Sequence, residues 1–355
     1  MDEPLVSICV PTYNGDRYLR ECLDSAVGQT HRNIEVLVVD DASSDGTTAI
    51  ASDYARADHR VRLHKNPHRL GLVGNWNRSV ELARGAWVKL LFQDDLLEPQ
   101  CVERMVAASQ SPGPPIIACW RNIVFEGTSD ETRRWYERHT VEESLRGVFP
   151  RERRISAERF CDAVLEHIGE NFIGEPTAVL LKRTTFDEFG TFNPDLIAVP
   201  DLEYWIRVGN KTGLTLVPET LATFRVHPGS ASSANARSRL YRMHEVDPAI
   251  LLHEFAYHPA FSRLRERAVR RDPPLDVRAM FGEQARRARI RATRSLAAEG
   301  SFERWTEWRD VASRYPEMRS SLLLRMARFR RLRRHIRSRV ARAVHGARSP
   351  QDVAR

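Results

Sequence analysis

The sequence predicts an α/β fold, a doubly wound, mostly parallel sheet flanked by helices, with a helical C-terminal extension. Short apolar runs alternate with helical patterns over the first 125 residues, as successive βαβ crossovers require. Polar clusters directly follow several of these runs, and from about residue 235 the chain is helical and rich in arginine. A chain of 355 residues is long enough for one large domain or two smaller ones.

Most of the predicted strands are continuous runs of Val, Ile and Leu, which is typical of strands buried on both faces. They span residues 6–10, 34–39, 61–65, 87–92, 116–124 and 178–181. Helices are predicted where apolar residues recur at steps of three or four. They span residues 18–26, 47–55, 75–83, 157–168 and 203–208. The segment 41–47 supplies a turn and a helix N-cap, and Gly85 ends the third helix.

Cysteine usage and the N-terminus indicate a soluble protein of a reducing, cytoplasmic compartment. The five cysteines are scattered, odd in number and never in a CxxC pair, which argues against a disulfide framework or a zinc knuckle. The first residues are acidic and run straight into strand-like sequence, unlike a signal peptide. No apolar stretch approaches the roughly 18 residues of a membrane span.

The net charge of +8 is concentrated near the C-terminus. Residues 318–348 contain eleven arginines and no acid, so the rest of the chain carries a net charge of −3. Apolar residues recur there at steps of three or four, which predicts an amphipathic basic helix. They are Leu322, Met326, Phe329, Leu332, Ile336, Val340 and Ala343. Such a helix can bind an anionic membrane surface, or it can pack on the rest of the protein with its arginines in solvent. RNA binding is disfavoured because stacking aromatics are nearly absent, so no nucleic acid partner is expected.

Two adjacent carboxylates, Asp94 and Asp95, follow the apolar run 87–92 with only Gln93 between. They repel each other, so a positive charge is expected beside them. In open α/β sheets, ligands bind at the C-terminal ends of parallel strands, which is where this pair lies. The alternative is that the pair only caps the helix that begins near Pro99.

Polar clusters at the ends of three predicted strands make the ligand interpretation stronger. The segment 11–15 follows the first strand and Asp40-Asp41 follows the second, and if the strands are parallel both meet Asp94-Asp95 at one edge of the sheet. Turn formation alone explains Asn14-Gly15, and helix capping alone explains Asp41. A shared edge is harder to explain by turns and caps. GxGxxG and Walker-type GxxxxGK motifs are both absent from the sequence.

Several motifs resemble those of the family 2 glycosyltransferases of the GT-A fold. They are VSICVPTYNGDRYLRECLDSAVGQT, IEVLVVDDASSDGT and LGLVGNWNRSVELARGAWVKLLFQDD, followed later by PDLEYWIR from Pro200 and by FRVHPGS from Phe224. The resemblance covers roughly residues 5–230. It implies a nucleotide-sugar-binding half over residues 1–125, an acceptor-binding half over 126–232, and an added helical extension over 233–355.

The resemblance also implies roles for the polar residues. Asp95 is expected to bind the metal, Mg²⁺ or Mn²⁺, with His227 as a second ligand, because a divalent cation stabilises the departing diphosphate. Asp94 is expected to contact the ribose or sugar. The expected nucleotide-sugar contacts are Pro11, Thr12, Tyr13, Asn14, Asp40, Asp41, Asn77 and Asp94. Asp41 would accept from a ring N–H of the base, and Tyr13 would pack on the base.

An inverting transfer needs one carboxylate to remove the proton of the acceptor hydroxyl. Asp201 is the candidate base, and Glu203, two residues later, is the fallback because Pro200 departs from the acidic residue that often precedes this Asp. His227 has either the functional role above or a structural one. Trp76 and Trp205 are expected in the core, with an aromatic platform for a sugar as the alternative.

The sequence therefore predicts a metal-dependent inverting glycosyltransferase that uses a nucleoside-diphosphate sugar and acts on a glycan or lipid-linked saccharide, in polysaccharide or glycoconjugate biosynthesis of the cell envelope. It is expected in the cytoplasm, peripheral on the inner face of the membrane. A sugar nucleotidyltransferase is one alternative, but it needs a Gly-rich phosphate loop with a basic residue where this chain has residues 11–14. A non-catalytic membrane or nucleic-acid adaptor is the other, and it would bind no nucleotide sugar.

Overall fold

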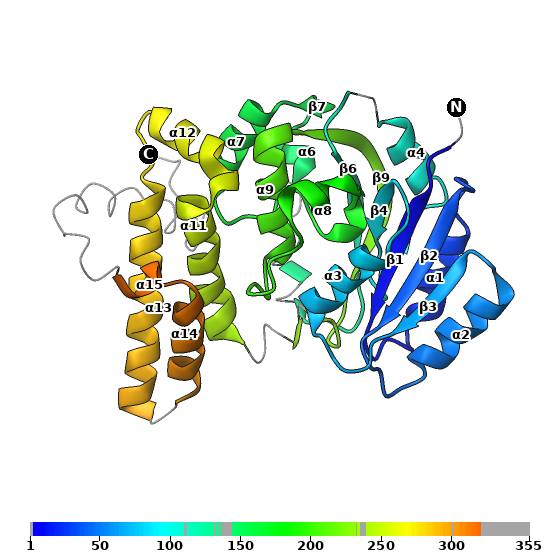
Figure 1. Ribbon diagram of the computed structural model, residues 1–355, viewed down its shortest axis with the longest axis horizontal. Coiled ribbons are helices and arrows are strands. Elements are labelled where there is room, and N and C mark those ends of the chain that lie inside the picture. Colours follow the sequence, from blue (N-terminus) through cyan, green and yellow to red (C-terminus); the bar gives the residue numbers. More distant parts are fainter. Residues whose placement is uncertain are drawn as a thin grey trace, which may run out of the picture.

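The computed structural model describes residues 3–109, 112–130, 133–134, 136, 144–231, 233–234, 239–299 and 302–320. Figure 1 shows a central twisted sheet with helices on both faces and a group of C-terminal helices at one end of the molecule. The basic helix predicted within residues 322–343 lies outside the described residues. Within the described part of the chain, no helix is both long enough and apolar enough to cross a membrane.

Four parallel strands form one half of the sheet, in the order β3-β2-β1-β4. They are β1 (Val6–Thr12), β2 (Ile34–Asp40), β3 (Val61–Lys65) and β4 (Trp87–Leu90). β1 and β2 are buried at every residue, as their continuous apolar sequences predicted. The prediction of four strands here is confirmed.

The other half of the sheet mixes parallel and antiparallel pairs. β8 (Val179–Lys182) runs antiparallel to both β4 and β6 (Ile116–Phe125), and β6 pairs in parallel with β9 (Leu214–Val226). The short strands β5 (Leu96–Leu97) and β7 (Arg154–Ile155) pair with β9. β9 was not predicted, because Pro218 lies near its middle. The pairing of β6 with β9 shifts register on both sides of Trp120, and these shifts accommodate Pro218 and Glu219 within the strand.

Helices cover both faces of the sheet. The part of the chain up to the end of β9, here called the sheet domain, contains α1 (Leu19–Val27), α2 (Thr47–Ala57), α3 (Leu72–Leu82), α4 (Cys101–Ala107), α6 (Leu145–Val148), α7 (Ala157–Glu166), the 3₁₀ turn η1 (Pro176–Ala178), α8 (Thr184–Phe189) and α9 (Pro200–Thr212). Two hydrophobic clusters lie on opposite faces, and β1 supplies Ile8 to one and Cys9 to the other. The doubly wound architecture is confirmed.

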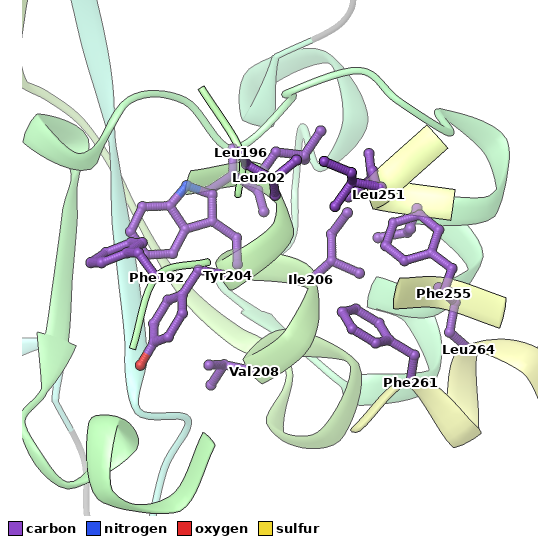
Figure 2. Packing of buried hydrophobic residues seen from close by; sticks show 14 of the residues in the cluster. Phe192, Leu196, Leu202, Tyr204, Ile206, Val208, Leu251, Phe255, Phe261 and Leu264 are labelled. Atoms are coloured by element: carbon purple, nitrogen blue, oxygen red, sulfur yellow. The ribbon is translucent and has the colours of Figure 1, made fainter. Parts of the chain in front are cut away.

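The helical C-terminal region packs against the sheet domain. It contains the π-helical turn η2 (Arg242–Val246), α11 (Asp247–Tyr257), η3 (Pro259–Phe261), α12 (Ser262–Arg270), α13 (Val277–Glu299), α14 (Glu303–Arg314) and α15 (Glu317–Ser320). In Figure 2, residues of α9 such as Ile206 pack with Leu251 and Phe255 of α11 in one apolar cluster. The C-terminal helices therefore share a core with the helix that carries Asp201.

A ladder of ion pairs joins α12 to α7. Arginines at four-residue intervals on the α12 side face acids at the same interval on α7. The pairs are Arg263 with Glu158 at 2.9 Å, Arg267 with Asp162, and Arg271 with Glu166 at 3.9 Å. The matching interval aligns the two helices.

Candidate active site

The predicted polar clusters meet at the C-terminal ends of β1, β2 and β4. Thr12 and Asp40, the last residues of β1 and β2, are paired in register, and the Asp41 amide donates to the Thr12 carbonyl at 2.8 Å. Gln93 connects this edge to the end of β4: its Oε1 accepts from the Tyr13 amide at 2.9 Å, and its Nε2 donates to the Tyr13 carbonyl at 3.2 Å. The structure thus brings the three clusters together, as parallel strands predicted.

Close packing at Gln93 explains Gly15. A Cβ atom at Gly15 would lie 2.2 Å from Oε1 of Gln93, so a side chain there would displace the Gln93 amide from Tyr13. Asn14, the preceding residue, adopts a positive φ of 47°. Its side-chain oxygen accepts from the Ser44 amide at 2.9 Å, and its own amide donates to Ser43 Oγ at 2.9 Å. Asn14 therefore joins the loop after β1 to the loop after β2.

Asp40 and Asp41 both hydrogen-bond within the chain. Asp41 is 2% exposed, and its carboxylate accepts from the backbone amides of Leu70 at 2.7 Å and Gly71 at 2.9 Å. Asp40 accepts from the Ser43 amide at 3.0 Å. Each carboxylate thus shapes a loop of the predicted nucleotide pocket, and the expected contact of Asp41 with the base stays a prediction.

Tyr13 lies at this edge with the guanidinium of Arg69 over its ring, 3.8 Å from the ring centre. Asn77, in contrast, turns away from the edge. Its Nδ2 donates to the Phe192 carbonyl at 2.9 Å, and its Oδ1 accepts from the Phe192 amide at 3.0 Å. The side chain predicted to bind the donor instead fastens the loop that contains Phe192.

Asn75, two residues before Asn77 on α3, contacts the ends of β1 and β2. It is 4% exposed, and its Nδ2 donates to the carbonyls of Val39 at 3.0 Å and Thr12 at 3.3 Å. Sequence reasoning missed this residue. Trp76, between the two asparagines, is 5% exposed and stacks on Phe92, so its predicted place in the core is confirmed, as is that of the fully buried Trp205.

The two adjacent carboxylates lie in different environments. Asp95 is fully buried: one oxygen accepts from Thr177 Oγ1 at 2.5 Å and the other from the Arg225 amide at 3.0 Å. Burial, followed by the charge of Asp94, raises the pKa of Asp95 well above its ordinary value. Each oxygen of Asp95 accepts one of these two hydrogen bonds and has a further lone pair. The role of Asp95 as the direct metal ligand therefore stays a prediction.

Asp94 is the member of the pair that lies beside His227. Its Oδ2 is 3.0 Å from Nε2 of the imidazole. Nδ1 of His227 accepts from the Gly229 amide at 3.2 Å, which assigns the proton to Nε2, where it is donated to Asp94. A carboxylate oxygen and an imidazole nitrogen at this separation can both reach one divalent ion in the tautomer that carries the proton on Nδ1 and leaves the Nε2 lone pair for the ion.

Arg225 fastens these groups to the rest of the site. Its Nε donates to the Asp94 carbonyl at 2.9 Å, and its Nη2 pairs with Glu21 at 2.6 Å. The guanidinium also pairs with Glu126 and lies over the ring of Tyr18, 4.5 Å from its centre. Every nitrogen of the guanidinium is thus engaged within the chain, and Arg225 holds the loop of Asp94 in place.

Asp201 lies in the first turn of α9 and is 8% exposed. Asn171 Nδ2 donates to its Oδ2 at 2.9 Å. Burial raises the pKa of Asp201 from 3.8 to about 7, against the opposing effect of the backbone hydrogen bond from Leu202. A carboxylate with a pKa near neutral pH is suited to general base catalysis.

Glu203, the fallback base, faces the core. It is 1% exposed, and its carboxylate pairs with the guanidinium of Arg207 through two nitrogens, one of them at 2.9 Å. The same guanidinium donates to the carbonyls of Phe189 and Thr191. Glu203 therefore has a structural partner in Arg207 and is less exposed than Asp201, so the structure favours Asp201 over this fallback.

One short segment, residues 171–177, contacts both acidic positions. Asn171 reaches Asp201 and Thr177 reaches Asp95, while Glu175 pairs with Arg121. Gly174, within the segment, has a φ of 108°, and a Cβ there would lie 2.9 Å from Nη1 of Arg121. Sequence reasoning missed this segment, because its contacts depend on residues 30 to 82 positions away.

The described residues contain no group of three or more His, Cys, Asp or Glu side chains that could hold a metal ion. Asp94 and His227 form a two-residue set. This set fits a cation that takes its remaining ligands from water and a substrate diphosphate, as divalent ions bound with phosphorylated substrates do. The donor chemistry, one oxygen and one nitrogen, suits Mn²⁺ better than Mg²⁺.

Comparisons with known proteins agree with this geometry. Residues 7–162 match the model of glycosyl transferase family 2. An uncharacterized protein of Mycobacterium tuberculosis is 32% identical over 224 residues, which is 63% of this chain and 67% of that protein. The putative glycosyltransferase EpsH of Bacillus subtilis is 31% identical over 192 residues, 48% of this chain and 55% of EpsH.

Two solved structures share the fold. Staphylococcus aureus TarS 1-349, in complex with UDP-GlcNAc, gives a TM-score of 0.56 at 14% identity and covers 88% of this chain and 81% of that one. The mannosyltransferase PcManGT of Pyrobaculum calidifontis, in complex with GDP-Man and Mn²⁺, gives 0.52 at 18% identity and covers 91% and 86%. At these identities the similarity concerns the fold alone.

Proposed function

The chain belongs to glycosyltransferase family 2 and has the GT-A fold, and from this premise we propose that it is a metal-dependent inverting glycosyltransferase. Its donor is a nucleoside-diphosphate sugar and its acceptor a glycan or a lipid-linked saccharide. The observation that carries the proposal is the segment 171–177, which contacts both Asp95, the predicted metal ligand, and Asp201, the predicted base. One compact site thus contains the groups that both halves of the reaction need.

Asp94 and His227 are the proposed metal ligands, in place of the Asp95 and His227 set that the sequence resemblance implied. Asp94 is preferred because it lies 3.0 Å from His227, whereas both oxygens of Asp95 are bonded inside the protein. The ion, Mn²⁺ in this proposal, stabilises the charge that develops on the departing diphosphate. The loop that contains Asp94 and Asp95 is held in place by three hydrogen bonds. The Asp95 carboxylate accepts from Thr177 and from the Arg225 amide, and the Arg225 side chain donates to the Asp94 carbonyl.

Asp201 accepts the proton of the acceptor hydroxyl in the proposed reaction. As that proton moves to the carboxylate, the hydroxyl oxygen forms a bond to the anomeric carbon, and the bond from this carbon to the diphosphate oxygen breaks on the opposite face. A single displacement inverts the anomeric configuration. Asn171 orients the carboxylate through its bond to Oδ2.

The acceptor side is proposed to be formed by the acceptor-binding half, with the loops in residues 126–155 and 190–200 setting its specificity. Next to these loops, Asn171 donates to Asp201, and Glu175 of the same segment pairs with Arg121. The arginine-rich segment after residue 320 is proposed to bind an anionic membrane surface, where lipid-linked saccharides are found. This arrangement suits a role in cell-envelope polysaccharide biosynthesis.

A thermal-shift panel of UDP-, GDP- and dTDP-sugars, with and without Mn²⁺, tests the donor and metal assignments. We expect one nucleotide class to stabilise the wild-type protein more strongly with Mn²⁺, and the Mn²⁺-dependent part to disappear in Asp94→Asn. Asp95→Asn is the matched comparison, because it changes the neighbouring carboxyl group. Loss of the Mn²⁺ effect in Asp95→Asn alone would return the metal to Asp95.

Asp201→Asn tests the base. We expect the variant to bind the donor as the wild type does and to lose transfer by a factor of about 10² to 10⁴. Glu203→Gln, on the same helix, serves as the control for the fallback assignment. Retained transfer in Asp201→Asn would exclude Asp201 as the base.

A further inference from the structure

We propose that Asp247 of the C-terminal helices is a positioning residue for the base Asp201. It holds the loop that leads into α9 and thereby sets where the carboxylate of Asp201 lies. The proposal rests on the proposed function, in which Asp201 accepts the acceptor proton.

Asp247 is fully buried at the first residue of α11. Its Oδ2 accepts from two consecutive backbone amides, those of Ile197 at 2.8 Å and Ala198 at 2.7 Å. Its Oδ1 accepts from Nε of Arg242 at 2.8 Å, and Nη2 of Arg242 donates in turn to the Asp195 carbonyl. The Asp247–Arg242 pair therefore satisfies three backbone groups of the loop.

A buried acid that binds another segment's backbone fixes geometry more than it stabilises the fold. Removing a carboxylate from water costs several kcal/mol, and a buried ion pair often returns little net stability. The hydrogen bonds it makes, however, are short and directional. The pair also flanks η2, a π-helical turn, and such turns are rare and often found at functional sites.

Two more contacts hold the same loop from the end of α14. Arg314 Nε lies 2.8 Å from Oδ1 of Asp195, and Asn193 Nδ2 donates to the Tyr315 hydroxyl at 3.2 Å. Along the rest of α9, apolar side chains pack on the C-terminal helices, as Leu202 and Ile206 do in Figure 2. The helix that carries Asp201 is thus fixed at its start by polar contacts and along its length by apolar ones.

The distance along the chain makes the coupling direct. Asp201 follows Ala198 by three residues, and it lies in the first turn of the helix that the loop begins. A general base must lie within hydrogen-bond reach of the acceptor hydroxyl, and a displacement of about 1 Å can reduce the rate by roughly 100-fold. A loop released from Asp247 would allow such a displacement.

Asp247→Asn is the test, because it keeps the side-chain volume and removes the charge that binds Arg242 and two amides. Transfer is measured as UDP or GDP released from UDP-GlcNAc or GDP-mannose with p-nitrophenyl glycosides as acceptors. We expect kcat to fall about 10- to 100-fold while the donor Kd, measured by calorimetry, changes less than about twofold. Amide hydrogen exchange at Ile197 and Ala198 should accelerate more than about tenfold.

Asp162→Asn is the matched control. Asp162 of α7 pairs with Arg267 of α12, so this variant also breaks an ion pair between the sheet domain and the C-terminal helices. It does not change the contacts of the loop that leads into α9. We expect its kcat and its exchange at Ile197 and Ala198 to match the wild type. Unchanged kcat in Asp247→Asn, or an equal fall in both variants, would overturn the proposal.

Arg314→Gln combined with Tyr315→Phe covers the case in which Asp247→Asn does not fold. Both side chains contact the loop from the end of α14; the Arg314 side chain is 42% exposed, whereas Tyr315 is buried. We expect a fall in kcat of at least about threefold at unchanged donor Kd, and an unchanged kcat would refute the proposal. If Asp201→Asn retains transfer, the proposed base is wrong, while accelerated exchange in Asp247→Asn still shows whether Asp247 holds the loop.

Discussion

The Asp201→Asn variant should be more stable than the wild type at high pH, although it loses transfer. Asp201 is 8% exposed, and burial raises its pKa from 3.8 to about 7. Between these pH values the folded protein retains a proton that the unfolded chain has released. The stability linked to this proton is fully present below about pH 4 and is lost as the pH rises to about 7. Asparagine is neutral throughout, so the variant escapes this loss.

The expected size follows from the two pKa values. One pKa unit corresponds to 1.36 kcal/mol, so the difference between a pKa of 3.8 in the unfolded chain and about 7 in the folded protein corresponds to a stability difference of roughly 4 kcal/mol. Integrated between about pH 5 and pH 8, the part that changes is roughly 2 to 3 kcal/mol. Urea unfolding of both proteins at the two pH values measures it. We expect the free energy of unfolding of Asp201→Asn, measured relative to that of the wild type, to be higher at pH 8 than at pH 5 by that amount.

Glu203→Gln supplies the contrast. Glu203 is also buried in α9, but it is paired with Arg207. Its removal leaves a buried guanidinium without its partner, so the variant should lose roughly 3–5 kcal/mol. If the relative stability of Asp201→Asn does not grow with pH, the folded-state pKa of Asp201 is close to its ordinary value, and the physical reason for assigning it as the base is lost.

Three other outcomes follow from the site. The kcat/KM of transfer should rise with pH and be half-maximal near pH 7, because Asp201 must be deprotonated to accept a proton. A profile that is flat from about pH 5 to 8 would contradict this. Gly174→Ala should cost roughly 1–3 kcal/mol in urea unfolding and reduce transfer, because φ is 108° and the new Cβ meets Arg121; wild-type behaviour would exclude a tight fit there. Removal of residues 321–355 should abolish co-sedimentation with vesicles that contain anionic lipid and leave donor binding unchanged. Vesicle binding by the shortened chain would place the membrane contact elsewhere in the protein.

The strands of the parallel half were predictable because burial on both faces leaves a continuous apolar signature. The convergence of Asp41 and Asp94 at one edge followed from that topology. β9 was not predictable in the same way, since Pro218 and Glu219 resemble a turn. Only pairing with β6, about 100 residues earlier in the chain, shows that the residues on both sides form one strand.

The side-chain contacts were not predictable where residues close in sequence point in different directions. Residues two positions apart on a helix differ by roughly 200° around its axis. Asn75 and Asn77 therefore face different partners, as do Asp201 and Glu203, and the sequence alone does not give the rotation. Arg207, four residues after Glu203, was the available signal that Glu203 is paired within the helix.

The partners that separate Asp94 from Asp95 come from distant parts of the chain. Thr177, the Arg225 amide and His227 lie 82 to 133 positions away from them in sequence. The sequence located the acidic pair, and only the three-dimensional structure shows which carboxylate is buried. The role of Asp247 was equally hidden, because its contacts are to backbone amides that carry no sequence signature.

The anomeric configuration of the product tests the central claim most directly. Nuclear magnetic resonance of the sugar transferred by the wild-type protein, with the donor identified in the nucleotide panel and Mn²⁺ present, gives the configuration from the coupling of the anomeric proton. A single displacement assisted by Asp201 predicts a product inverted relative to the donor, and no such product from Asp201→Asn. A product with the configuration of the donor would contradict the account.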